Sequence, residues 1–101
     1  MNNLEKYAKQ LGYNTCYTNS YKFSHVNFTR KCVFIKPNYS LQRDHQFAHE
    51  IGHIILFKRF YGSKIINEIL SWIVGLYVCV RCKVKLKGFF KEMMRCVRTY
   101  V

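Results

Sequence analysis

Residues 41–57 read LQRDHQFAHEIGHIILF, and this stretch decides the fold because it predicts a long amphipathic helix in the middle of the chain. Ser40 precedes it as a candidate N-cap, and no proline interrupts it. Gly52 is its only weak helix former, and a glycine there leaves room for a strand or a substrate to pass close to the helix. The apolar residues recur at helical spacing and form one face. They are Leu41, Phe47, Ala48, Ile51, Ile54 and Ile55.

The same stretch contains the run His49-Glu50-Ile51-Gly52-His53, an H-E-x-x-H pattern. Residues four apart share one face of a helix, so both imidazoles can reach a single metal ion. The intervening Glu50 then lies beside a water on that ion and can take its proton as a general base. The alternative interpretation is an ordinary amphipathic helix with histidines on its surface.

A catalytic zinc site normally has three protein ligands and keeps its fourth position for water. Only two acidic residues follow the pattern, Glu68 and Glu92, and no histidine does. Glu68 is the predicted third ligand because a turn can bring the next predicted helix back against the first. Glu92 or a thiolate from Cys79 or Cys82 is the alternative, and a surface or capping role for Glu68 is the non-functional interpretation.

Several other side chains are weaker candidates for supporting roles at such a site. Asp44 or a backbone carbonyl could accept a hydrogen bond from the second nitrogen of a ligand histidine. Tyr61 or Tyr77 could stabilise an oxyanion, although core packing is the simpler role for both. His45 is expected to support the ligands or to be exposed, since one helix cannot easily aim three successive turns at one ion. His25 is expected on the surface of a strand.

The rest of the chain predicts an α+β fold in a single domain, residues 1–101. Helices are expected at residues 3–12, at residues 64–80 with Ser63 as cap after a turn at 58–63, and at residues 89–97. Residues 13–36 are rich in Tyr, Thr, Phe and Val, with strand-like runs at 21–28 and 31–35. They predict two or three strands, paired antiparallel.

The 101 residues carry a net charge of +12. Seven Lys or Arg oppose three acids in residues 1–57, whereas ten oppose two in residues 58–101. The positive electrostatic field of such a chain attracts nucleic acid, an acidic protein surface or anionic lipid. Alternatively, the charges only keep a protein with a small core soluble. No RNP-like pattern, phosphate-binding glycine loop or arginine-rich run appears, so charge alone does not identify a nucleic-acid binder.

Cysteine usage and hydropathy predict a cytoplasmic protein without a transmembrane segment. The five cysteines are odd in number and no secretion signal is evident, so the thiols are expected to be reduced. Cys79 and Cys82 form a lone C-x-x-C, for which free, buried thiols are a better explanation than a structural zinc site. The apolar residues 69–80 are too few to cross a bilayer and predict a buried helix, with peripheral attachment to anionic lipid as a minor alternative.

Residues 42–56 resemble the signature of the ImmA/IrrE-type metallopeptidases of bacteria and their mobile elements. In that signature an Arg and an Ala precede H-E-[IL]-G-H, and aliphatic residues follow. A second motif of the family is matched in part by residues 67–77, where Glu68, Trp72 and Gly75 fall in register. Small and amide residues are replaced at positions 69 and 70, and Cys79 stands where the family has proline.

The resemblance implies a zincin-like fold with Zn²⁺ held by His49, His53 and Glu68, and Glu50 as the catalytic base. It also implies a protein substrate, such as a helix-turn-helix repressor that silences a phage or another mobile element. The basic segment 81–101 is expected to be truncated or divergent from the family fold. The rival hypothesis is a non-catalytic module, stapled by metal, whose basic surface contacts nucleic acid or a partner protein.

Overall fold

The computed structural model of the chain describes residues 2–56 and 64–100. In these residues it has four α-helices, one 3₁₀ helix and a three-stranded mixed sheet, so the expected α+β class is confirmed. In chain order the elements are α1 (Asn3–Gln10), β1 (Asn14–Tyr17), β2 (His25–Asn27), β3 (Cys32–Ile35), α2 (Leu41–Leu56), α3 (Lys64–Arg81), α4 (Phe89–Val97) and η1 (Arg98–Tyr100).

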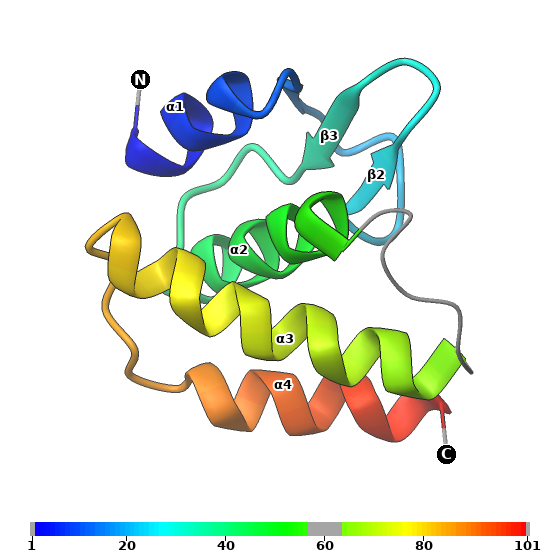
Figure 1. The fold of residues 1–101 in the computed structure, drawn as a ribbon, viewed down its shortest axis with the longest axis vertical. Coiled ribbons are helices and arrows are strands. Elements are labelled where there is room, and N and C mark those ends of the chain that lie inside the picture. The colour runs from blue at the N-terminus through cyan, green and yellow to red at the C-terminus, as the bar shows by residue number, and fades with distance from the viewer. Residues whose placement is uncertain (1, 57–63, 101) are drawn as a thin grey trace.

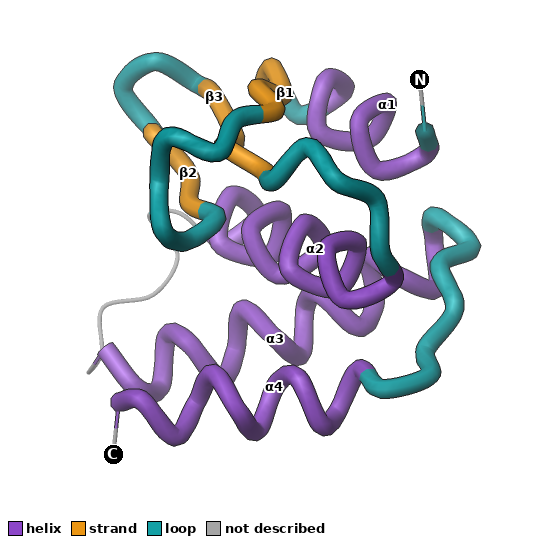
Figure 2. The backbone as a smooth tube through the Cα atoms, turned by 180° about the vertical axis from the view of Figure 1, so that it is seen from behind, coloured by secondary structure: helices purple, strands orange, loops and turns teal. Residues whose placement is uncertain are grey.

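The elements form three layers with α2 in the middle. The sheet and α1 lie on one side of α2, and α3 with α4 lies on the other (Figure 1). Seen from behind, α3 and α4 run side by side, and α1 lies next to β1 (Figure 2). Because α2 is covered from both sides, it buries polar as well as apolar residues, among them His45, His49 and Glu50.

The sheet differs from the expected antiparallel pairing. Its order is β1-β3-β2, with β2 antiparallel to β3 but β1 parallel to β3. The chain therefore passes from one edge of the sheet to the other before β3 enters between them. Val33 and Ile35 of β3 are almost completely buried, which explains why the middle strand is the most apolar.

The predicted strand at 21–28 is shorter in the structure, where only His25–Asn27 pairs with β3. Local hydrogen bonds compete with the ladder before it. The Thr18 hydroxyl accepts from the Ser20 amide at 3.0 Å, and the Lys36 ammonium donates to the Tyr21 carbonyl. These contacts satisfy backbone polar groups of the segment while it follows a series of bends. Its alternating sequence therefore does not form a long strand.

The predicted helices are confirmed to within two residues over the described part of the chain. The Ser40 hydroxyl caps α2 by accepting from the Arg43 amide at 3.0 Å, and the Asn2 side chain caps α1. α3 extends one residue beyond its expected end, and α4 has the expected bounds. Phe57, the turn at 58–63 and Ser63 lie outside the described residues.

Two glycines set the close approach of α2 and α3. A Cβ added at Gly52 would lie 2.2 Å from the backbone oxygen of Ser71, and one at Gly75 would lie 3.2 Å from the Cα of His49. The space at Gly52 is therefore filled by the backbone of α3, not by a strand or a substrate as its sequence suggested. This contact brings the start of α3 against the His49–His53 turn.

No helix among residues 2–56 and 64–100 is long and apolar enough to span a membrane. All five cysteines are free, and Cys79 and Cys82 are buried as expected. The Cys82 thiol, one residue beyond the end of α3, donates to the Asn3 carbonyl at 3.7 Å and so ties the end of α3 to α1. The thiols of this pair therefore have a packing role in the described structure.

Candidate metal centre

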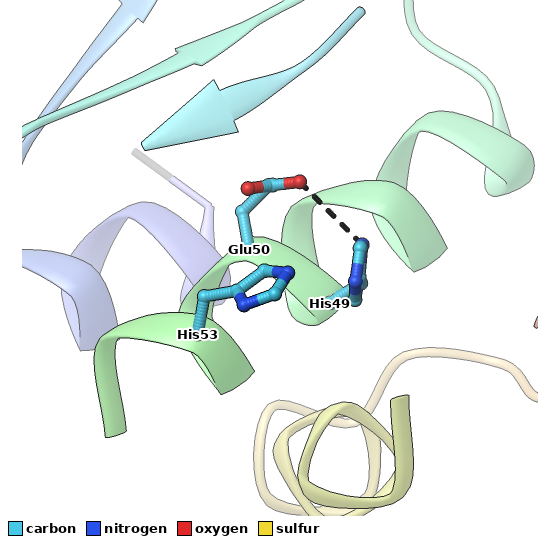
Figure 3. Close-up of side chains that lie close together, drawn as sticks. All are labelled: His49, Glu50 and His53. Atoms are coloured by element: carbon cyan, nitrogen blue, oxygen red, sulfur yellow. Dashed lines mark ion pairs between the residues drawn. The ribbon is translucent and has the colours of Figure 1, made fainter. Parts of the chain in front are cut away.

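Two helices bring the predicted ligands together in one place. The Nε2 atom of His49 lies 3.0 Å from Oε1 of Glu68, and Nε2 of His53 lies 2.7 Å from Oε2 of the same carboxylate. His49, Glu50 and His53 also offer ligand atoms that all lie within 4.8 Å of one another, as expected of a group that could hold a metal ion (Figure 3). The carboxylate of this close group is Glu50 of α2, whereas Glu68 of α3 contacts each imidazole through a different oxygen.

The orientation of His53 is set by Ser71 of α3. The Ser71 hydroxyl donates to the Asn67 carbonyl at 2.7 Å, so it accepts from Nδ1–H of His53 at 2.8 Å. A neutral His53 then has a lone pair, not a proton, on the Nε2 atom that faces Glu68. Two acceptor atoms 2.7 Å apart require a cation between or beside them, either a proton or a metal ion.

His49 is held by stacking and not by hydrogen bonds. Its ring lies parallel to the Trp72 indole, with centroids 4.3 Å apart and an interplanar angle of 6°. Both of its ring nitrogens are buried, and neither has a hydrogen bond of good geometry despite the short distance from Nε2 to Glu68. A buried imidazole without such partners is costly, and coordination of a metal would satisfy its free nitrogen.

Burial lowers the pKa of His49, so its ring stays neutral and keeps a lone pair for a metal. A tetrahedral ion with bonds of about 2.1 Å separates its ligand atoms by roughly 3.4 Å. The atoms of Glu68 and the histidines are 2.7 and 3.0 Å apart. Both pairs are therefore closer than two ligands of one tetrahedral ion, so the side chains would have to move apart to admit it.

The two carboxylates of the centre have opposite protonation behaviour. Burial raises the pKa of Glu50 well above its ordinary value of 4.5, and the charge of Glu68 raises it further. Burial also acts to raise the pKa of Glu68, but in the metal-free chain hydrogen bonds that His49 and His53 donate from protonated Nε2 atoms outweigh it and lower that pKa to about 2. Glu68 is thus suited to remain an anionic ligand, whereas Glu50 is suited to accept and return a proton.

The centre opens into a cleft of about 680 Å³. One wall is β2 with the segment before it, the other is α2, and Arg95, Cys96 and Thr99 close one end. His49, Glu50, His53 and Glu68 all line this cleft. Four cationic side chains line it as well, namely Lys22, Lys36, Arg43 and Arg95. A substrate in the cleft would therefore meet the site's two carboxylates within a basic surround.

The alternative ligands have other partners in the structure. Glu92 is buried against Arg95 with an ion pair of 2.5 Å, and it does not line the cleft. Burial raises the pKa of the Cys79 thiol to about 12, which opposes the thiolate that a metal needs. Cys82 contacts α1, away from the centre. Glu68 is the acidic side chain that reaches both histidines.

Several supporting roles expected from the sequence are wrong. His45 is neither exposed nor beside the ligands, because its Nε2 donates to the Lys85 carbonyl at 2.7 Å and its ring packs edge-on against Phe89. Asp44 pairs with Arg43 at 3.5 Å, and Ser71 takes the role suggested for it. These side chains therefore fix the core and the start of α2.

The structure also places His25 and Tyr77 differently from the sequence-based predictions. His25 is half-buried and stacks on Phe34, with ring centroids 4.9 Å apart, so it is part of an aromatic cluster and not a plain surface residue. Tyr77 is 53% exposed and does not line the cleft, so it is neither a core residue nor placed to stabilise an oxyanion there. Tyr61 lies outside the described residues.

The roles of Ser71 and Trp72 are not evident from the sequence alone. They follow Glu68 by three and four residues, so all three lie on one face of α3. A serine and an aromatic residue at that spacing from a candidate ligand are the signal that could have identified them. Their side chains orient His53 and His49 respectively.

Ser71→Ala is expected to weaken zinc binding by about 10- to 100-fold, because His53 loses the acceptor that holds its proton on Nδ1. Competition with a chromophoric zinc chelator measures the affinity. Ser20→Ala, which removes an exposed hydroxyl outside the cleft, is the matched control and is expected to bind zinc as the wild type does. Equal affinities in the two variants would contradict the role given to Ser71.

Comparison of this chain with protein-family models, with curated proteins and with solved structures finds no match.

Proposed function

We propose that this protein is a zinc-dependent metallopeptidase that hydrolyses a peptide bond in a protein substrate. The observation that supports this most strongly is the convergence of His49, His53 and Glu68 at the wall of a cleft, with Glu50 beside them. The donor set of two imidazoles and one carboxylate is one that zinc takes in hydrolytic enzymes. The resemblance of residues 42–56 to ImmA/IrrE-type metallopeptidases, which implies a zincin-like fold, agrees with it.

Each side chain then has a defined task. His49, His53 and Glu68 would hold the ion, which when bound would supply a Lewis acid. Ser71 keeps the His53 lone pair directed at the ion, and Trp72 keeps the His49 ring in place. Glu50 takes the proton of the attacking water and passes it to the departing amine.

The sheet supports a mode of substrate binding. β2 is an edge strand that lines the cleft, and its outer edge has no strand partner among residues 2–56 and 64–100. An extended peptide can add to such an edge through main-chain hydrogen bonds. A peptide placed there would pass over Glu50 and the histidines. By resemblance, its source would be a repressor that silences a mobile element.

The purified chain is expected to hold one zinc ion, and the ion is expected to stabilise it by about 4 kcal/mol when free zinc is 1,000 times the dissociation constant. Thermal unfolding with and without a chelator, beside elemental analysis, measures both quantities. Glu68→Gln is expected to lose most of this affinity, whereas Glu92→Gln, which removes a buried carboxylate outside the cleft, keeps it. An unchanged zinc affinity in Glu68→Gln would contradict the proposed centre.

A second candidate function is favoured by the charge of the C-terminal region. Six cations of residues 83–98 are exposed, and a single acid, Glu92, stands among them. They are Lys83, Lys85, Lys87, Lys91, Arg95 and Arg98. As a metal-stapled module, the chain would bind nucleic acid with an affinity that falls steeply with salt and is unchanged by Glu50→Gln. No binding of a duplex at low salt would eliminate this candidate.

A further inference from the structure

Two cysteines on neighbouring strands lie in contact. The Sγ atoms of Cys16 in β1 and Cys32 in β3 are 2.8 Å apart. In the parallel register Asn14 pairs with Cys32 and Cys16 pairs with Phe34, so both cysteines lie on the same face of the sheet. A disulfide bond is about 2.05 Å long, so an approach of roughly 0.8 Å would allow the two sulfurs to bond.

The segment between these cysteines builds one wall of the cleft. Six residues from this segment line the cavity: Lys22, Phe23, Ser24, His25, Val26 and Phe28. The segment leaves β1, pairs with β3 as β2 and then enters β3, so it connects the two strands that carry Cys16 and Cys32. A covalent bond between the cysteines would therefore close the loop that forms this wall.

We propose that Cys16 and Cys32 form a reversible disulfide, and that this bond fixes residues 17–31, the segment whose residues 22–28 supply one wall of the cleft. The oxidant would be a small disulfide of the glutathione class. In this reaction the two protein thiols are oxidised to one disulfide, and the small disulfide is reduced to two thiols. The site is distinct from the metal centre and does not depend on it.

The surroundings of the two thiols set the order of the steps. Cys16 is exposed, whereas Cys32 is buried, and burial followed by the contact with Cys16 raises the pKa of Cys32 to about 11. The Cys16 thiolate therefore attacks the small disulfide first, which forms a mixed disulfide and releases one thiolate. Cys32 then loses its proton and attacks Sγ of Cys16, and the second small thiol leaves.

The experiment treats the full chain with glutathione disulfide, blocks remaining thiols with iodoacetamide and maps the peptides by mass spectrometry. Three alkylated cysteines and a Cys16–Cys32 cross-linked peptide are expected. Thermal unfolding of the oxidised chain is expected to shift upward by roughly 10 °C, because the bond restricts the unfolded chain. Hydrogen exchange of the amides at residues 17–31 is expected to slow.

Variants make the result specific. Cys16→Ser and Cys32→Ser should each abolish the cross-link and the thermal shift, whereas Cys96→Ser, which removes a half-buried thiol across the cleft, should retain both. Five alkylated cysteines after oxidation, a glutathione adduct that persists on Cys16, or a cross-link to another cysteine would overturn the proposed bond. A cross-link that leaves exchange at residues 17–31 unchanged would overturn its effect on the cleft wall.

Discussion

Glu50→Gln is expected to lower peptide hydrolysis by about 10²- to 10⁴-fold, because the amide cannot accept the proton of the attacking water. The described cleft lining has two carboxylates, Glu50 and Glu68. Glu68 contacts the Nε2 atoms of both histidines, so Glu50 is the candidate base. Zinc is expected to stay bound, since the ligands from α2 and α3 are unchanged. A peptide library incubated with each zinc-loaded protein and read by mass spectrometry gives the cleavage rates.

Glu92→Gln is the matched control for this substitution. It also removes a buried carboxylate and one negative charge, but Glu92 pairs with Arg95 and lies outside the cleft lining. Its cleavage rates should equal those of the wild type. Unchanged cleavage by Glu50→Gln would contradict the peptidase mechanism, whereas loss of zinc by that variant would show that Glu50 is itself a ligand.

Glu50→Gln also has a pH-dependent effect on the stability of the metal-free chain. Burial raises the pKa of Glu50 in the folded state above 4.5, so the folded state binds the proton more tightly than the unfolded state does. This contribution to stability is present at low pH and is lost as the pH rises from 4.5 through the folded value. Glu50→Gln removes this loss, so at neutral pH the variant is expected to unfold at a temperature no lower than the wild type.

Gly52→Ala is expected to lower the free energy of unfolding by about 3 kcal/mol, because the added methyl group cannot fit between α2 and α3. Its Cβ would lie 2.2 Å from the backbone oxygen of Ser71, and a backbone atom cannot turn aside as a side chain can. The higher helix propensity of alanine returns only about 1 kcal/mol. Urea unfolding of the metal-free proteins measures the difference.

Gly75→Ala provides a graded comparison at the same helix contact. Its nearest atoms are 3.2 Å away, so a shift of a few tenths of an ångström relieves the contact and a smaller loss of stability is expected. Zinc affinity should fall with Gly52→Ala as well, since the Ser71 backbone is displaced together with the hydroxyl that holds His53. A Gly52→Ala protein as stable as the wild type would show that the helices separate freely here.

Local sequence patterns predicted the helices well and the sheet less well. The spacing of apolar residues and the Ser40 cap fix where α2 begins, and these signals are contained in a few consecutive residues. Strand pairing depends on residues far apart in the chain. The alternation of residues 21–28 is compatible with a long strand, whereas the hydrogen bonds at Thr18 and Tyr21 hold the preceding residues as bends and pairing starts at His25.

The candidate site shows the same division. His49, Glu50 and His53 can be recognised as site residues from the sequence because one helix places all three. Glu68 could be predicted as a ligand because so few acidic residues follow them. The parallel stacking of Trp72 on His49 and the bond from His53 to Ser71 depend on how closely α3 approaches α2. That distance is set by Gly52 and Gly75, each of which faces the backbone of the other helix. The spacing of apolar residues in either helix does not reveal this contact.

A sheet edge that can receive a guest strand can equally receive the same strand from another copy of the protein. β2 has only three residues, and the chain carries a net charge of +12, so brevity and mutual repulsion both oppose such stacking. Salt at physiological strength confines that repulsion to about 8 Å, and higher salt shortens its range further. Low ionic strength is therefore expected to favour the monodisperse chain, and added salt to leave the shortness of β2 as the remaining barrier.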